Sequence, residues 1–272
     1  KGIKICNFKK NNLSVVNYSK PINKKVKLNE LQKNLYSIPK SPNLVPYVTS
    51  YYKKNWGFCI SENERKKLKH GTYHAVIKSS FKKGHIEFGT KILEGDTNKD
   101  FLISSYLCHP SMANNELSGP LVLIGLYKKL YQLKTRKLNY IFLINPETIG
   151  SICFLHKYGQ KLKKTLQAGL VLTCLGGPKK KISYKKSRQE NSSLDKLFIH
   201  LSKKNSCLVR DFDPSEGSDE RQYCSSEFNL PVGQASRTIY GQYKEYHTDG
   251  DTKQFMSMKK IEQSVNFLFS VI

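Results

Sequence analysis

The sequence has 272 residues, of which 38% are hydrophobic and 25% charged, so it is long enough for one large globular domain or for a large and a small one. No apolar run approaches the roughly 20 residues needed to cross a bilayer, and residues 1–10 lack the apolar stretch of a signal peptide. Composition therefore argues against membrane insertion, and we expect a cytoplasmic protein.

The net charge is +25, from 46 Lys and Arg residues against 21 Asp and Glu residues. Such an excess can serve a polyanionic partner. Nearly all of it is lysine, however, whereas base reading and bidentate phosphate recognition rely on arginine. We therefore interpret the charge as a solvated surface and expect no nucleic-acid partner. The densest basic run, Pro178–Arg188, is the one place where we expect an anionic substrate to dock.

The seven cysteines are scattered, lie mostly in apolar segments and show no CxxC spacing. We interpret them as reduced core thiols and as neither disulfide partners nor zinc-binding clusters. They are Cys6, Cys59, Cys108, Cys153, Cys174, Cys207 and Cys224.

The first third of the chain has β-like segments punctuated by glycine, at Thr72–Ile77 and His85–Phe88, and one short helical pattern at Leu28–Leu35. Aromatic residues gather between Val45 and Cys59. Because aromatics dominate small cores, we expect a core there, with a binding surface as the alternative. The sequence thus predicts a small β-rich domain over residues 1–95.

Residues 96–272 alternate short apolar runs with longer amphipathic ones, which is typical of an α/β fold with a mainly parallel sheet. Ser151 and Ser192 are the expected N-caps of two of its helices. The predicted strands are Phe101–Cys108, Leu138–Ile144 and Gly169–Cys174, and the predicted helices are Leu117–Leu133, Ser151–Lys164, Ser192–Lys204 and Gln254–Ile272.

Two polar clusters follow predicted strands directly. His109 comes just after the apolar strand, and Asn114, Asn115 and Glu116 open the next helix, so an imidazole and a carboxylate share one loop. Glu147 stands just past the second strand, where a lone carboxylate suits a general base or a metal ligand. Open α/β sheets place their sites at this edge, and the sequence predicts a metal site there.

Two further polar runs lie in the last third of the chain. One is Glu216–Gln222, which interrupts two apolar stretches, and the other is Tyr243–Thr252, which places His247 in a loop rich in Gly and Asp. Taken singly, such runs are ordinarily turns or helix caps. Together with the first two clusters they favour a functional site built from four loops of one sheet.

At these residues the chain resembles the bacterial aminopeptidase-like proteins often encoded near surface-polysaccharide biosynthesis genes. Their core is similar to the zinc exopeptidases that include glutaminyl cyclase and glutamate carboxypeptidase. The resemblance covers nearly the whole chain, and it rests on Val45–Tyr52, Trp56–Cys59, Ser105–Ser111, Asn115–Gly119, Pro146–Ser151, Ser218–Gln222 and Glu245–Thr248.

The resemblance implies that the chain is incomplete at both ends. The catalytic domain, residues 96–272, is expected to begin before Lys1 and to be followed after Ile272 by a small winged-helix-like domain. Residues 1–95 are then expected to be a β-rich insertion in a mixed, mainly parallel α/β domain of the zinc exopeptidase type.

Carried over position by position, the resemblance implies zinc ligation by His109 and His247. Asn115 and Glu116 are further candidate ligands. Asn115 stands where the wider group has an Asp that bridges two metals, and an amide is a poorer zinc ligand, so either Glu116 takes over or one metal is lost. Thr173 occupies the strand end where the group has another ligand Asp. One zinc ion is therefore expected and a second stays open, with Asp219 as a further expected ligand.

The resemblance also implies metal-assisted hydrolysis of an amide bond by an aminopeptidase-like exopeptidase. Glu147 would act as general base, and Arg221 or Tyr246 would stabilise the oxyanion. Ser218 and Glu220 are expected in substrate binding, and the carboxylates of Glu116, Asp219 and Glu220 suit an α-ammonium group.

The substrate implied is a peptide or an aminoacylated small molecule. One alternative is an amidase or deacylase that acts on an amino sugar or an aminoacylated glycan. A second is a peptidase fold that has lost catalysis and serves as a binding module, which the presence of Asn115 and Thr173 and the single Glu147 favour. Assembly into a homo-oligomer stays open.

Overall fold

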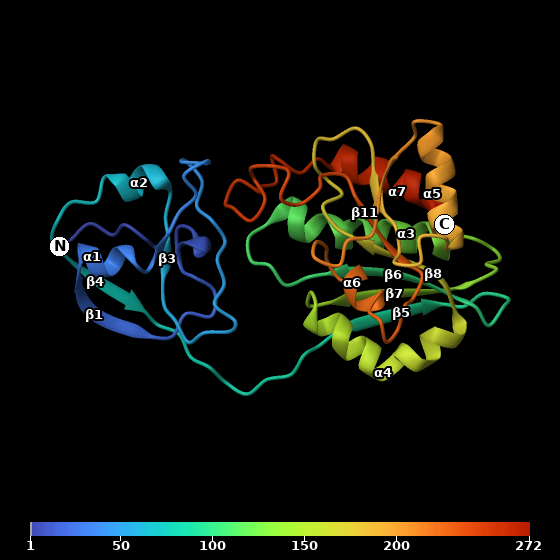
Figure 1. Ribbon diagram of the computed structural model, residues 1–272, viewed down its shortest axis with the longest axis horizontal. Coiled ribbons are helices and arrows are strands. Elements are labelled where there is room, and N and C mark those ends of the chain that lie inside the picture. The colour runs from blue at the N-terminus through green and yellow to red at the C-terminus, as the bar shows by residue number, and fades with distance from the viewer. Residues whose placement is uncertain (1) are drawn as a thin grey trace. The chain divides into compact units, whose positions relative to one another are not determined.

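The structure is a computed structural model that describes residues 2–272, and the chain in it divides into two compact units (Figure 1). The larger unit comprises His85–His109, Ala113–Gln242 and Lys253–Ile272. The smaller unit ends its first segment at Gly84 and also includes Pro110–Met112 and Tyr243–Thr252. The division predicted at residue 95 therefore differs from the structure, because the strand at residues 89–93 pairs with the sheet of the larger unit.

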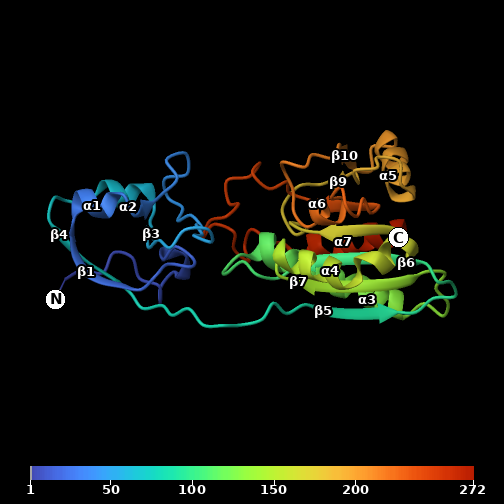
Figure 2. The ribbon, with the colours of Figure 1, turned by 60° about the horizontal axis from the view of Figure 1, so that its bottom comes forward.

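The larger unit is built on a seven-stranded sheet of order β10-β9-β11-β8-β6-β7-β5, which runs from β5 at one edge to β10 at the other (Figure 2). β6 pairs in parallel with β7 and β8, and β8 with β11, whereas β5 and β9 run antiparallel to their neighbours β7 and β11. This confirms the predicted mixed, mainly parallel α/β fold. The strands are β5 Gly89–Leu93, β6 Asp100–Tyr106, β7 Asn139–Asn145, β8 Leu166–Leu172, β9 Ser183–Lys185, β10 Leu208–Arg210 and β11 Val232–Ser236.

Helices cover both faces of this sheet (Figure 1). Phe101 and Ile103 of β6 enter the core shared with α3, α5 and α7, whereas Leu102 enters the core shared with α4 and α6. All of β6 is buried, as expected for a central strand of a parallel sheet. The helices are α3 Ser118–Tyr131, α4 Ile149–Thr165, α5 Ser193–Lys203, α6 Glu220–Tyr223 and α7 Met258–Val271, and a π-helical turn, η2, spans Ala113–Leu117.

The two predicted helix starts have different outcomes. Ser192 caps α5 as predicted, because its hydroxyl accepts the Asp195 N–H at 3.1 Å and the Asp195 carboxylate accepts the Ser192 N–H at 3.0 Å. The prediction for Ser151 is wrong. Helix α4 begins at Ile149, and its N-cap is Thr148. Ser151 lies inside the first turn, where its hydroxyl donates to the Thr148 carbonyl at 2.8 Å.

The smaller unit has two short sheets and a mainly aliphatic core that includes two aromatic residues. Trp56 and Phe58 are buried there, as expected, but Tyr51 and Tyr52 are exposed. Residues 85–88 form no strand, and the first helix is shorter than predicted. The elements are η1 Asn12–Ser14, β1 Ile22–Lys27, α1 Leu28–Gln32, β2 Leu35–Tyr36, β3 Phe58–Cys59, α2 Glu62–Lys66 and β4 Thr72–Ile77, with β1 antiparallel to β4 and β2 parallel to β3.

The basic run Pro178–Arg188 forms no continuous docking surface. Lys179 and Lys180 are exposed, but Lys185 points inward from β9 and is buried, and Lys186 pairs with Glu190 and Asp211. Strand β9, Ser183–Lys185, is buried at all three positions, so this part of the run does not lie at the surface. Among residues 2–272, no helix combines the length and the apolar character needed to span a membrane.

Gly119 lets the start of α3 pack directly on the sheet. A β-carbon at this position would lie 2.5 Å from the Leu172 carbonyl oxygen and would also overlap the Ser105 hydroxyl. We expect Gly119→Ala to lower the free energy of unfolding by about 1–3 kcal/mol. Urea unfolding of the variant beside Gly89→Ala is the measurement. At Gly89 a β-carbon would have no other atom within 4 Å, so an equal effect of both substitutions would contradict the packing argument.

Candidate active site in the larger unit

The centre of the candidate site lies in the loop that follows β6. Strand β6 ends at Tyr106, and the chain then carries Cys108 and His109 before the π-helical turn η2 presents Glu116. His109 Nδ1 lies 3.0 Å from Glu116 Oε2, and both side chains are more than nine-tenths buried. Such turns within helices are frequent at functional sites. The predicted imidazole and carboxylate are therefore brought together.

Glu147 joins this pair from the end of the neighbouring strand, β7. Its Oε2 lies 3.6 Å from His109 Nε2, and its Oε1 accepts a hydrogen bond from the Ser218 hydroxyl at 2.6 Å. Burial raises the pKa of Glu147, although the nearby His109 and the Ser218 hydrogen bond act in the opposite direction. Burial lowers the pKa of His109, but its contacts with Cys108, Glu116 and Glu147 outweigh burial and raise that pKa to about 10.

Asp219 holds the segment that carries Glu147. Its Oδ1 accepts the Thr148 N–H at 2.6 Å and the Ser151 hydroxyl at 3.2 Å, and its Oδ2 accepts the Asn145 side-chain amide at 2.9 Å. Thr148 has φ +63°, an unfavourable conformation for a β-branched residue. Burial raises the pKa of the Asp219 carboxyl to about 7. One of its oxygens is engaged by the start of α4 and the other by the end of β7.

Glu220 belongs to a buried ion pair. Its Oε1 lies 3.0 Å from Lys185 Nζ, and the two side chains are 0% and 2% exposed. Lys185 Nζ also donates to the carbonyl oxygens of Asp213 and Glu216, and the Ser218 N–H donates to the Glu220 carboxylate. This network fixes the loop from which Ser218 reaches Glu147.

Asn115 is buried next to Glu116 in the turn η2. Its Nδ2 donates to the Tyr106 hydroxyl at 3.3 Å, and that hydroxyl is 2.6 Å from Thr173 Oγ1. All three side chains are buried. The positions where the resemblance implied two aspartates therefore hold an amide and a hydroxyl that are linked through a tyrosine.

The remaining predicted residues lie at the edge of this arrangement or in the smaller unit. Arg221 is half-buried, and its Nε lies 3.4 Å from the Ser218 carbonyl oxygen. His247 and Tyr246 are in the smaller unit, where their rings stack at 3.9 Å and the Tyr47 N–H donates to the His247 carbonyl at 2.7 Å.

Cys108 is the residue that sequence analysis missed. Its side chain is exposed, so the expectation of a core thiol is wrong here, although Cys59, Cys174, Cys207 and Cys224 are buried. Its Sγ lies 3.4 Å from His109 Nδ1 and accepts the Glu147 N–H at 3.3 Å. Its position next to His109 just after a strand was the signal that could have identified it.

We expect Asp219→Asn to destabilise the larger unit. An amide offers one acceptor oxygen where the carboxylate offers two, so at least one of its buried donors loses its partner, at a cost of about 1–3 kcal/mol. The free energy of unfolding in urea is the measurement. Glu227→Gln makes the same chemical change in an exposed pair with Lys163 and should change stability by less than about 0.5 kcal/mol. Equal effects would show that Asp219 does not hold the start of α4.

Comparison with known proteins gives the family. Residues 12–272 match the family described as a domain of unknown function, DUF4910. A Clostridium acetobutylicum protein, provisionally named a polysaccharide biosynthesis protein with an aminopeptidase-like domain, is 40% identical over all of this chain. The chain spans 62% of the length of that relative.

Solved structures agree. The crystal structure of a protein from Clostridium acetobutylicum, provisionally named a peptidase, matches 99% of this chain and 63% of its own with 37% identity and a TM-score of 0.92. A zinc aminopeptidase from Bacillus subtilis shares the fold, with a TM-score of 0.66 at 14% identity over 87% of this chain and 62% of its own. This chain resembles aminopeptidases in fold, as its sequence motifs predicted, and it belongs to the DUF4910 family.

Proposed function

We propose that this chain is the core of a zinc-dependent hydrolase that cleaves the amide bond next to a free amino group, as an aminopeptidase does. The observation that carries the proposal is that Glu147, just after β7, lies beside His109, which follows the adjacent parallel strand β6 and pairs with the buried Glu116. The aminopeptidase-like relatives support the class of reaction.

The donor atoms at this centre fit one divalent cation. Imidazole nitrogen and carboxylate oxygen are typical zinc ligands, and those of His109 and Glu116 lie 3.0 Å apart in a buried setting. A zinc ion bound there would polarise the substrate carbonyl and lower the pKa of a bound water towards about 7. Asn115 and Thr173 supply only neutral oxygens, which favours one ion over two.

The residues of the chain then have distinct tasks. Glu147 takes the proton from the attacking water and passes it to the leaving amine, a role that suits a carboxylate whose pKa is raised by burial. Ser218 orients Glu147 through its hydroxyl, and Asp219 positions the same segment from behind. Because both Asp219 oxygens are engaged, we assign it positioning in place of the expected metal ligation.

We do not assign Asp219 and Glu220 to the binding of the substrate's ammonium group, although the sequence analysis expected both carboxylates there. Asp219 and Glu220 are completely buried, and Glu220 is already paired with Lys185. Neither carboxylate offers a face to a substrate. Arg221 and Tyr246 as oxyanion-stabilising groups, and His247 as a ligand, remain predictions from the resemblance.

Metal content and two substitutions test the proposal. Purified chain should contain one zinc per molecule by mass spectrometry, and His109→Ala should lose it. Glu147→Gln should keep the zinc but hydrolyse aminoacyl nitroanilides at least about 100-fold more slowly, because it loses the general base. A folded wild-type chain without zinc would contradict the proposal and favour a binding module.

The name of the Clostridium acetobutylicum relative favours one second function, a deacylase that acts on an amino sugar. Blocking the substrate's amino group distinguishes the two activities. An aminopeptidase should lose turnover of a nitroanilide when its amino group is acetylated, whereas a deacylase should release acetate from an N-acetylated amino sugar. Release of acetate from the sugar without cleavage of any free-amine substrate would replace the first proposal with the second.

A further inference from the structure

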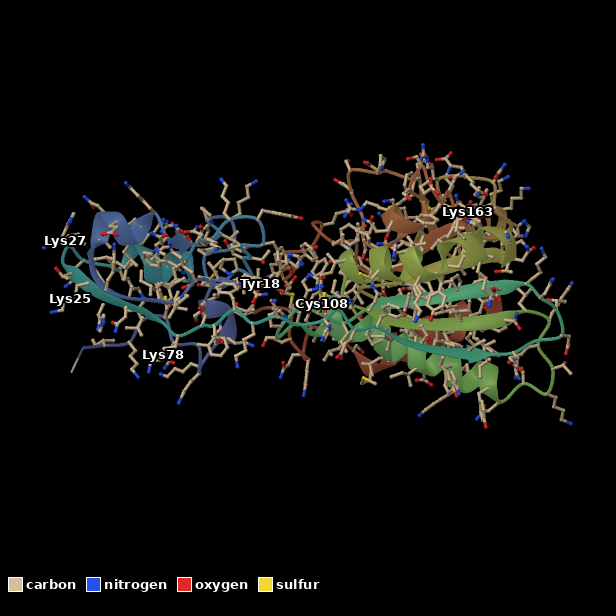
Figure 3. All side chains as sticks on the ribbon, turned by 90° about the horizontal axis from the view of Figure 1, so that it is seen from below. Tyr18, Lys25, Lys27, Lys78, Cys108 and Lys163 are labelled. Carbon is tan, nitrogen blue, oxygen red and sulfur yellow. The ribbon has the colours of Figure 1, made fainter. Side chains whose placement is uncertain are left out.

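We propose that Cys108 is a metal ligand, so that the centre is a thiolate, imidazole and carboxylate site formed by Cys108, His109 and Glu116. The inference rests on the proposed function, because it concerns the same metal. Cys108, labelled in Figure 3, lies in the loop that follows β6, between the strand and the turn that presents Glu116.

The spacing of the three donor atoms fits one tetrahedral ion. The Cys108 Sγ, a His109 ring nitrogen and a Glu116 oxygen all lie within 4.8 Å of one another. Zinc bonds of about 2.3 Å to sulfur and about 2.0–2.1 Å to nitrogen and oxygen place tetrahedral donors about 3.4–3.6 Å apart. The sulfur lies 3.4 Å from His109 Nδ1, and Nδ1 lies 3.0 Å from Glu116 Oε2. Small movements therefore bring all three atoms to bonding distance.

The three facing atoms are all of types that bind zinc. His109 Nδ1 faces the Cys108 sulfur and the Glu116 oxygen at once. Thiolate sulfur, imidazole nitrogen and carboxylate oxygen are typical zinc ligands. A zinc ion between the three atoms would therefore have one ligand of each type.

Backbone groups hold two of the donors in place. The Cys108 N–H donates to Glu116 Oε1, which leaves Oε2 towards the imidazole, and the Glu147 N–H donates to the Cys108 sulfur at 3.3 Å. Cys108 is exposed whereas Glu116 is buried, so an ion can enter from the thiol side. On binding, the S–H bond breaks, its proton leaves to the buffer, and a sulfur–metal bond forms.

This donor set also determines which ions bind. Thiolate and imidazole ligands prefer zinc, cobalt and cadmium, whereas magnesium, calcium and manganese prefer oxygen ligands. The other ring nitrogen, His109 Nε2, lies 3.6 Å from Glu147 Oε2. Metal binding at Cys108 would thereby fix the orientation of the ring beside Glu147.

Cobalt spectroscopy tests the assignment without any substrate. Metal-free chain titrated with Co²⁺ should develop a thiolate-to-cobalt charge-transfer band in the near ultraviolet together with visible d–d bands. Cys108→Ser should keep the d–d bands, lose the charge-transfer band and bind zinc at least about 10-fold more weakly, since even outer-shell substitutions cost 10–100-fold in affinity. Cys153→Ser, at a half-buried thiol outside this group, should keep both bands.

The outcomes separate this inference from the proposed hydrolase. Visible cobalt bands without the charge-transfer band in the wild-type chain would overturn the assignment of Cys108 and leave the zinc hydrolase in place. Failure of the folded chain to bind cobalt or zinc would overturn both. As a second readout, zinc should protect Cys108 from iodoacetamide in the wild-type chain, and equal alkylation with and without zinc would overturn the ligand assignment.

Discussion

The parallel pairing of β6 with β7 is the constraint on which the candidate site depends. Their register pairs Tyr106 with Asn145, so the two strands end side by side. His109 and Glu147 lie in the loops directly after these two strands. The loops that follow parallel strands lie at the same edge of the sheet. Pairing of the two strands is therefore enough to make the His109 imidazole and the Glu147 carboxylate neighbours.

Buried charged groups behind the site support this edge of the sheet. The Asp219 carboxylate accepts a hydrogen bond from the N–H of Thr148, whose φ is positive. The Lys185–Glu220 ion pair holds the loop that carries Ser218. Buried ion pairs contribute little net stability, because desolvation offsets their attraction. Their value here is geometric, since both networks end on the segment that orients Glu147. The polar loop around residues 216–222 is therefore mainly a support for the site.

Sequence reasoning predicted the parts of the site that follow long apolar strands. His109 and Glu147 were identified because a buried strand ends just before each of them. Outside the site, the N-cap Ser192 was identified because capping depends only on neighbouring residues. The contacts of Lys185 and Asp219 could not be predicted, since neither a run of charges nor a Ser-Asp-Glu motif reveals which oxygens and ammonium groups are already engaged. Strands β9 and β10 are too short for a periodic signal, and the start of α4 depends on a left-handed Thr148 that no propensity predicts.

The burial of acidic side chains affects how the molecule behaves in solution. Asp100, Glu116, Asp195, Asp219 and Glu220 are all inside, whereas nearly every lysine lies on the surface. The outer surface is therefore even more cationic than the formal +25 indicates. At 0.01 M salt its electrostatic potential extends about 30 Å into the solvent, where it repels other copies of the chain and concentrates anionic glycans and phosphates; at 0.15 M it is screened within about 8 Å. Colloidal stability and the encounter rate with charged substrates should both depend on ionic strength, while the internal carboxylates keep the centre itself attractive to cations.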